Sequence, residues 1–238
     1  MPTAEPSLHP RMTQDLERGA ALSLLPVVST ICYYALPDSI QSYRLVQFAP
    51  QILAYLSLTI WTAWNDAVQA KLGLQGEKFM SGMKLGLATG IILGSVNTFM
   101  ILRIVPALGY DITFLRETPH AQIPVWIMLP WFICGIALFV ELNFRGFLLG
   151  RLAVLESRRW RTGFGRRWSP LAVLFSALVF AFDPFMTTTF KHLHWIAVWD
   201  GVVWAVIWVR SNNLYATVIA HAIEVIVMYS AVRSALNP

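Results

Sequence analysis

Seven long runs of apolar residues constrain the fold of this chain more than any other feature of its sequence. They are separated by charged or proline- and glycine-containing connections, and they cover residues 19–37, 45–64, 79–105, 123–150, 169–188, 196–210 and 214–232. A helix needs roughly 20 residues to cross the hydrocarbon core of a bilayer, where every backbone polar group must be satisfied inside the protein. The runs therefore predict an all-α fold, a polytopic membrane helix bundle with about seven spanning helices.

The composition agrees, because 56% of the residues are apolar and only 13% are charged, unlike a soluble globular domain. Seven spans would occupy most of the 238 residues and leave no room for a separate soluble domain. We expect a polar cytoplasmic N-terminal segment at residues 1–18 and a single transmembrane domain at residues 19–238. Cys32 and Cys134 lie inside apolar runs, so we expect small buried side chains rather than a disulfide.

Basic residues are distributed unequally between the two sides of the predicted bundle. Most of the 18 lysines and arginines fall on the side of the N-terminus: Arg11, Arg18, Lys71, Lys78, Lys84, Arg151, Arg158, Arg159, Arg161, Arg166, Arg167 and Arg210. This bias predicts that the N-terminus lies in the cytoplasm and, after seven spans, the C-terminus outside. We expect the chain in the bacterial inner (cytoplasmic) membrane. The basic cluster at residues 158–167 is better interpreted as a topology determinant that contacts anionic membrane lipids than as a nucleic-acid site.

A stripe of glycines recurs every four residues in the third apolar run, at Gly82, Gly86, Gly90 and Gly94. Bare backbone on one face lets another helix approach closely, and van der Waals packing then replaces the hydrophobic drive that is absent in lipid. A contact within the chain is favoured over a contact with a second chain, because a bundle has many more internal than external helix contacts.

Charged side chains inside apolar runs are costly, so each is a candidate functional residue until a structural partner is found. Glu141 and Arg145 lie four residues apart on one helical face, where they could also form a self-neutralising pair that only stabilises the helix. His221 and Glu224 lie three residues apart on the last run. A lone buried histidine is usually a hydrogen-bonded core residue, but the nearby glutamate favours a polar site.

A third candidate region contains Asp183, followed by His192 and His194. The His-x-His pattern can chelate a metal ion, but in a loop at the membrane surface it is more often simply solvated.

The first two regions are expected at the same depth in the membrane. Glu141 and His221 each lie ten residues from the cytoplasmic end of their runs, at Arg151 and Ser211, and a rise of about 1.5 Å per residue places both about 15 Å deep. Two polar faces at one depth on different helices are what a buried catalytic or ion-binding site requires.

Three stretches carry a resemblance to a known family, namely Glu141 to Leu149, Ser176 to Phe180, and Trp208 to Ala222. Together they resemble the CPBP family of intramembrane metalloproteases, the CAAX-protease and bacteriocin-processing group that includes the Rce1-type prenyl proteases. The match covers roughly Pro124 to Tyr229. The resemblance implies that glutamate and histidine side chains activate a water for attack on a peptide bond, with or without a bound zinc ion.

The sequence departs from the family pattern at three positions. Val140 stands where the first motif has its first glutamate, Pro184 where the second motif has histidine, and Val225 where the last motif has asparagine. An alternative alignment takes Phe190 to His194 as the second motif. It is disfavoured because it leaves a short connection before Gly201, where the family usually has a longer one.

Of the residues that the family uses to activate water, only His221 is retained unambiguously. The resemblance and the clustered charges together imply a changed site, with catalytic roles for Glu141, Arg145, His221 and Glu224, and with zinc held by His221, Glu141 and Asp183. The chain would then be an intramembrane endopeptidase that acts on a membrane-associated protein or peptide.

Two other functions remain open from the sequence. The lost glutamate and histidine favour, with equal weight, a catalytically inactive family member that serves as a membrane scaffold or binds a membrane partner. A transporter or channel is less favoured, because no inverted repeat relates the two halves and no polar path crosses the first three runs.

Overall fold

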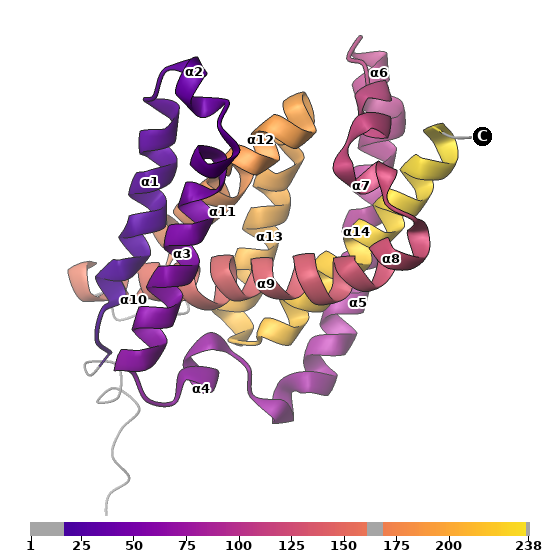
Figure 1. The fold of residues 1–238 in the computed structure, drawn as a ribbon. Coiled ribbons are helices and arrows are strands. Elements are labelled where there is room, and N and C mark those ends of the chain that lie inside the picture. The colour runs from indigo at the N-terminus through magenta and orange to yellow at the C-terminus, as the bar shows by residue number, and fades with distance from the viewer. Residues whose placement is uncertain (1–16, 161–168, 237–238) are drawn as a thin grey trace, which may run out of the picture.

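The computed structural model describes residues 17–160 and 169–236, and within these ranges every regular element is a helix (Figure 1). The predicted all-α fold is confirmed for this part of the chain. Nearly all of the predicted N-terminal segment 1–18 lies outside the described residues, as do Arg11, Arg161, Arg166 and Arg167.

The longer helices carry the architecture: α1 (Leu24–Tyr34), α3 (Arg44–Trp64), α5 (Phe79–Phe99), α10 (Gly150–Trp160), α11 (Pro170–Ala181), α13 (Ile196–Ser211) and α14 (Leu214–Leu236). Shorter elements connect or extend them: η1 (Ala20–Ser23), α2 (Asp38–Gln41), α4 (Val68–Leu72), η2 (Gly76–Lys78), η3 (Met100–Ile104), α6 (Val105–Ala107), η4 (Thr113–Glu117), α7 (Pro119–Gln122), α8 (Val125–Trp131), η5 (Phe132–Ala137), α9 (Leu138–Glu141), η6 (Leu142–Leu149), α12 (Pro184–Phe190) and η8 (Lys191–Leu193).

Four helical stretches of the described chain are long and apolar enough to cross a membrane: Arg44–Trp64, Val68–Ala107, Val125–Arg159 and Leu214–Leu236. The pair Pro170–Ala181 and Pro184–Leu193 is bent by 51° at its break and would make a fifth span. The prediction of seven spans is therefore not shown. Although the other apolar runs are also helical, α1 has only 11 residues and α13 only 16, fewer than the roughly 20 that a straight crossing needs.

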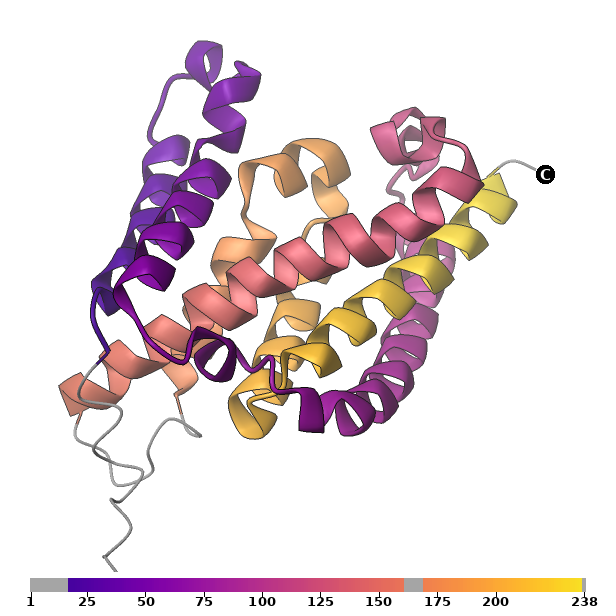
Figure 2. The same cartoon turned by 60° about the horizontal axis from the view of Figure 1, so that its bottom comes forward.

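One long helical stretch, from α8 through α10, passes across the other helices (Figures 1 and 2). It contains two π-helical segments, η5 and η6. Behind it, α11 packs against α13, while α5 and α14 form the most extensive helix pair. π-helical turns are frequent at functional sites. Glu141 immediately precedes η6 and Arg145 lies within it, so this segment is a candidate functional site.

The glycine stripe of α5 lies against α14. A methyl group added to Gly86 would lie 2.7 Å from the carbonyl oxygen of Ala216, and one added to Gly90 would lie 2.6 Å from that of Ala220. Any side chain would therefore collide with backbone, so only glycine permits this approach. The predicted close helix contact is confirmed, and it is formed within the chain.

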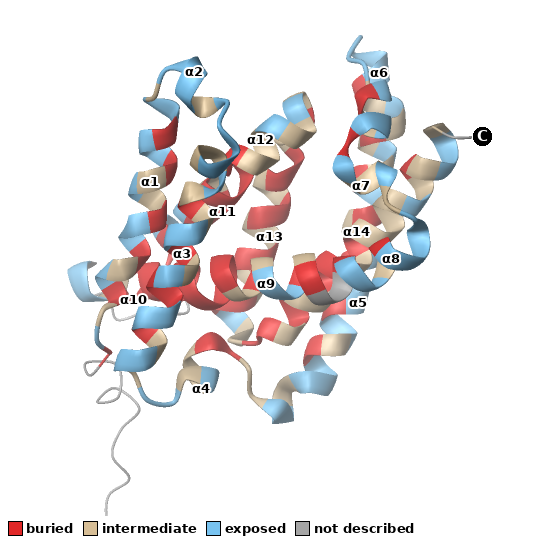
Figure 3. Cartoon of the chain, viewed as in Figure 1, coloured by how far each residue is buried: buried red, intermediate tan, exposed pale blue. Residues whose placement is uncertain are grey.

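Large apolar side chains cover the outside of the bundle, whereas charged side chains are buried inside it. Trp126 exposes 76% and Leu45 exposes 75% of its surface, but Arg145 is completely buried. Figure 3 shows buried residues gathered on α13 and on the part of the long helix that crosses the bundle. This distribution fits a protein surrounded by lipid. Cys32 is exposed on the outer surface, so the prediction of a buried side chain was wrong there; the side chain of Cys134 is not among those described.

Glu17, near the start of the described chain, is anchored in the bundle. Its Oε1 accepts a hydrogen bond of 3.1 Å from Trp61 Nε1, and its carboxylate forms an ion pair with the buried guanidinium of Arg151. Arg158 Nη2 donates to the Glu17 carbonyl oxygen at 3.0 Å. Arg151, and Arg158 from the cluster interpreted as a lipid contact, therefore bind Glu17 to the helices.

Candidate active site

Glu141 and His221 meet across two helices in the centre of the bundle. Glu141 ends α9, His221 lies in the first half of α14, and His221 Nδ1 is 3.0 Å from Glu141 Oε1. These two residues, which the sequence places at the same depth, are therefore in contact. Since a carboxylate oxygen accepts hydrogen bonds, Nδ1 is the protonated ring nitrogen, and Nε2 keeps the lone pair that can accept a proton.

Arg145 compensates the charge of Glu141. Its Nη1 lies 3.2 Å from Glu141 Oε1, and both side chains are completely buried. Its guanidinium also lies over two aromatic rings, 4.6 Å from the centre of Phe180 and 4.9 Å from that of Trp204. An arginine between π faces and a carboxylate is well stabilised even in an apolar interior, so Arg145 is the counter-ion that holds the Glu141 side chain in place.

The imidazole of His221 stacks on the indole of Trp204, with ring centres 4.4 Å apart. Phe180 meets the same imidazole edge to face at 6.2 Å. With Glu141 fixing Nδ1 and two aromatic rings fixing its plane, His221 is held in one orientation. His221 borders a cavity, whereas Glu141 does not.

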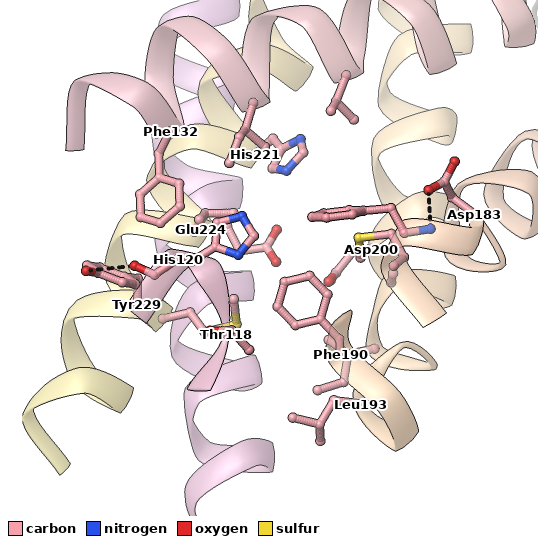
Figure 4. A pocket seen from close by; sticks show the side chains of 18 of the residues that line it. Thr118, His120, Phe132, Asp183, Phe190, Leu193, Asp200, His221, Glu224 and Tyr229 are labelled. Atoms are coloured by element: carbon pink, nitrogen blue, oxygen red, sulfur yellow. Dashed lines mark hydrogen bonds between the residues drawn. The ribbon is translucent and has the colours of Figure 1, made fainter. Parts of the chain in front are cut away.

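A cavity of about 690 Å³ lies beside His221 (Figure 4). Its walls come from α3, the η4–α7 region, η5, α12, α13 and α14, and most of the side chains that line it are apolar or aromatic. The size and apolar lining are typical of a pocket for an organic ligand. Figure 4 shows His221, Glu224 and Asp200 around its central part, with Asp183 at its edge.

Asp200 and Glu224 form a second polar centre on the cavity wall, together with Asn97 of α5. Asn97 Nδ2 donates to Asp200 Oδ2 at 3.0 Å and to Glu224 Oε1 at 2.8 Å, and Asn97 Oδ1 accepts a hydrogen bond of 3.0 Å from Trp199 Nε1. Asp200, Glu224 and Asn97 are all buried. The sequence indicates Glu224 as a site residue but not Asp200 or Asn97, although a carboxylate within the apolar run 196–210 is itself a signal of function.

Asp183 is placed apart from Glu141 and His221. It is the N-cap of α12, where its Oδ1 accepts hydrogen bonds from Phe185 N at 3.0 Å and from Gln51 Nε2 at 2.9 Å. The first bond caps α12, because it satisfies an otherwise unpaired amide of the first helical turn. The second links α12 to α3, so the carboxylate of Asp183 has a structural role.

The residues present do not fit the predicted zinc site of His221, Glu141 and Asp183. Within residues 17–160 and 169–236, no group of three or more histidine, cysteine, aspartate or glutamate side chains is arranged to hold a metal ion. A zinc ion needs three or four such ligands around one point. Zinc binding therefore stays a prediction without support from the geometry.

His192 and His194 point to different neighbours. The ring of His192 stacks on Tyr110 at 5.1 Å, whereas His194 Nδ1 lies 2.5 Å from the Lys191 carbonyl oxygen and its ring contacts Phe182. Neither histidine borders the cavity. The alternative alignment, which would make His194 a site residue, thus gains no support.

Comparison with protein families gives one finding. Residues 122–227 match the family described as type II CAAX prenyl endopeptidase Rce1-like, so the resemblance read from the motifs is confirmed over this region. The matched region includes Glu141, Arg145, Asp200, His221 and Glu224. No curated protein and no solved structure matches the chain.

Proposed function

We propose, from the premise that residues 122–227 are an Rce1-like type II CAAX prenyl endopeptidase (CPBP) domain, that this membrane protein is an intramembrane endopeptidase. Its substrate would be a membrane-associated protein or peptide that enters the apolar cavity. The family match supports the class of reaction, and the geometry around His221 supports the manner in which this chain performs it.

The observation that carries the proposal is the orientation of His221. Glu141 binds Nδ1 at 3.0 Å, Trp204 stacks on the ring at 4.4 Å, and the histidine borders the cavity. A histidine held in this way by a carboxylate can take a proton from water through Nε2, while the carboxylate stabilises the resulting imidazolium. In this mechanism Glu141 and Arg145 position the base and do not themselves touch the substrate.

No metal step is part of this mechanism, because the described side chains near His221 do not assemble a metal site. The first-motif position that carries glutamate in the family is Val140, which lines the cavity. The nucleophile is then a water activated by one histidine, in a cavity whose apolar walls exclude bulk solvent.

The test is a cleavage assay on the full chain in lipid nanodiscs, incubated with detergent-free membrane fractions. New peptide N-termini are identified by mass spectrometry in samples with wild type, His221→Ala and Glu77→Gln protein. Glu77 is exposed on η2, so its variant controls for the loss of a charge. Wild type and Glu77→Gln should yield the same new termini, and His221→Ala should reduce their rate at least about 100-fold. Equal cleavage by His221→Ala, or no new termini with wild type, would contradict the proposal.

A noncatalytic partner-binding role is the second candidate. Val140 on the cavity wall favours it, because an apolar side chain there makes the cavity more suitable for binding a lipid-embedded segment than for water chemistry. Photo-crosslinking from position 139, where Phe139 lines the cavity, would distinguish the two. A stable partner recovered intact with wild type, without any new termini, would favour this role over the peptidase.

A further inference from the structure

The Asp200–Glu224 pair is not used by the mechanism above, yet it adjoins His221. Asp200 lies one helical turn before Trp204 on α13, and Glu224 lies one turn after His221 on α14. Trp204 and His221 stack on each other, while one amide nitrogen of Asn97 donates to both carboxyl groups. The Trp204–His221 stack and the Asp200–Glu224 pair are thus two neighbouring contacts between α13 and α14.

The side chains of Asp200 and Glu224 are hydrogen-bonded to each other, and Asn97 Nδ2 donates to one oxygen of each. Asp200 is 3% and Glu224 is 2% exposed. Two carboxylates so placed in an interior that excludes water do not both ionise, so the pair holds one proton.

Unsatisfied polar atoms of the pair and of Trp204 indicate a ligand. Apart from the pair itself, Asp200 Oδ1 and Glu224 Oε2 have no hydrogen-bond partner among the described residues, and neither has Trp204 Nε1. All three residues are at least nine-tenths buried and line the cavity. Unpaired buried polar atoms are costly, so these three atoms are available to bind a group that accepts both a hydrogen bond and a proton. A secondary amide is such a group.

We propose that Trp204 and the Asp200–Glu224 pair form the subsite for the scissile amide: Trp204 N–H donates to the carbonyl oxygen, and the pair delivers its proton to the leaving nitrogen. This assignment rests on the proposed peptidase function. It makes His221 the general base and the pair the general acid, two roles that differently situated titratable groups commonly divide.

The proposed step balances. A water oxygen bonds to the carbonyl carbon while its proton passes to His221, and the carbonyl oxygen takes the electron pair of the C=O π bond and is stabilised by Trp204 N–H. The carbon–nitrogen bond then breaks, the nitrogen takes the proton of the carboxyl pair, and a carboxylic acid and an amine leave. The proton on His221 replaces the one that the pair has given up, so one water is consumed for each amide.

The first test compares an amide with an ester. The probe is a quenched fluorescent peptide built on the cleavage site mapped in the nanodisc assay, and its matched analogue carries an ester at the scissile position. The leaving group of the ester is an alkoxide, which can depart without a proton from a general acid, whereas the amine of the amide needs one. Asp200→Asn and Glu224→Gln should therefore lower kcat for the amide about 100-fold and leave ester cleavage near the wild-type rate.

Two further variants separate the roles. His221→Ala should abolish cleavage of both probes, because both need an activated water. Trp204→Phe keeps an aromatic ring against His221 but removes the N–H, so it should lower kcat for both probes by about 100-fold with little change in KM. Glu77→Gln, with its exposed carboxylate replaced, should behave as wild type on both.

The second test needs no substrate. Dicyclohexylcarbodiimide is an apolar reagent that reacts with protonated carboxyl groups and adds a mass that peptide analysis detects. At neutral pH it should label Asp200 or Glu224 and not Glu77, and raising the pH should suppress the label. The double variant Asp200→Asn with Glu224→Gln should lose it.

Each outcome has a distinct meaning. Ester-selective retention of activity together with pH-dependent labelling supports the assignment. Loss of both probes in His221→Ala with full amide cleavage in Asp200→Asn and Glu224→Gln would overturn the assignment and leave the proposed function standing, as would the absence of labelling on both carboxyl groups. Absence of cleavage by wild type would overturn the proposed function and the assignment with it.

Discussion

Arg145 Nη1 lies 3.2 Å from Glu141 Oε1 within one helix, and neither side chain has any exposed surface. Arg145→Ala would leave the Glu141 carboxylate buried without its counter-ion, which should lower stability by about 3 kcal/mol or more. The double variant Glu141→Gln with Arg145→Met removes both charges and should recover much of that loss. Thermal unfolding in detergent measures this, and a double variant that is as unstable as Arg145→Ala would show that the two charges are not coupled.

The α5–α14 contact predicts strong sensitivity at Gly90. Even Gly90→Ala places a methyl group 2.6 Å from the Ala220 carbonyl oxygen, so the helices must separate and stability should fall by about 1–3 kcal/mol. Gly76→Ala is the matched control, because a methyl group there has no atom within 4 Å. Equal unfolding temperatures for the two variants would show that the helices do not depend on this close approach.

Two variants of Asp183 can show whether this residue acts as a helix cap or as a charged site residue. Asp183→Asn keeps an oxygen for the Phe185 amide and should unfold near the wild-type temperature, whereas Asp183→Ala should lose about 1 kcal/mol, because asparagine caps helices well and alanine does not. If the two variants were equally destabilised, the negative charge of Asp183 rather than its capping bond would be what matters.

His120, which lines the cavity, predicts a pH dependence of stability. Burial lowers the pKa of its imidazole below the ordinary value of 6.5, so the folded protein binds this proton more weakly than the unfolded chain. The contribution of neutral His120 to the free energy of unfolding is therefore fully present above pH 6.5 and is lost as the pH falls below that value. Comparing unfolding at about pH 8 and about pH 5, His120→Phe should lose less stability than wild type. An identical loss in both would exclude His120 as the cause.

The orientation in the membrane can be tested with reporters. α4 and the start of α5 lie at the end of the molecule opposite to the end of α14 (Figure 1), and Lys71 and Lys78 flank that connection. A reporter inserted at Gly76 should be cytoplasmic and one fused after Leu236 should be outside, because basic residues favour the cytoplasm. A cytoplasmic location for both would show that the chain crosses the membrane an even number of times between them.

Helix positions follow directly from the sequence. The apolar runs correspond to helices because lipid permits little else, and the equal depth of Glu141 and His221 along their runs is compatible with the contact that they form. The number of spans cannot be predicted from the apolar runs. A full crossing, the bent pair α11–α12 and the short helix α13 all appear in the sequence as similar apolar runs.

The second polar centre depends on packing that no local pattern contains. Asn97 is separated by more than a hundred residues from Asp200 and from Glu224, and it reaches both because α5 lies unusually close to α14. Asp183 shows the opposite case. Its position beside Pro184 at a helix start suggests capping, and that local role, rather than a metal site, is the one found.

The direct backbone contact between α5 and α14 also affects how the cavity can deform. On the α5 side of this contact there are no side chains whose rotation could absorb a displacement, because Gly86 and Gly90 lie directly against the backbone and Cβ atoms of α14. We therefore expect the two helices to move as one unit, and Asn97 links Asp200 on α13 to that unit. Any widening that admits a bulky substrate is then expected at the wall formed by α3, η5 and α12, with the spacing between His221 and the Asp200–Glu224 pair unchanged.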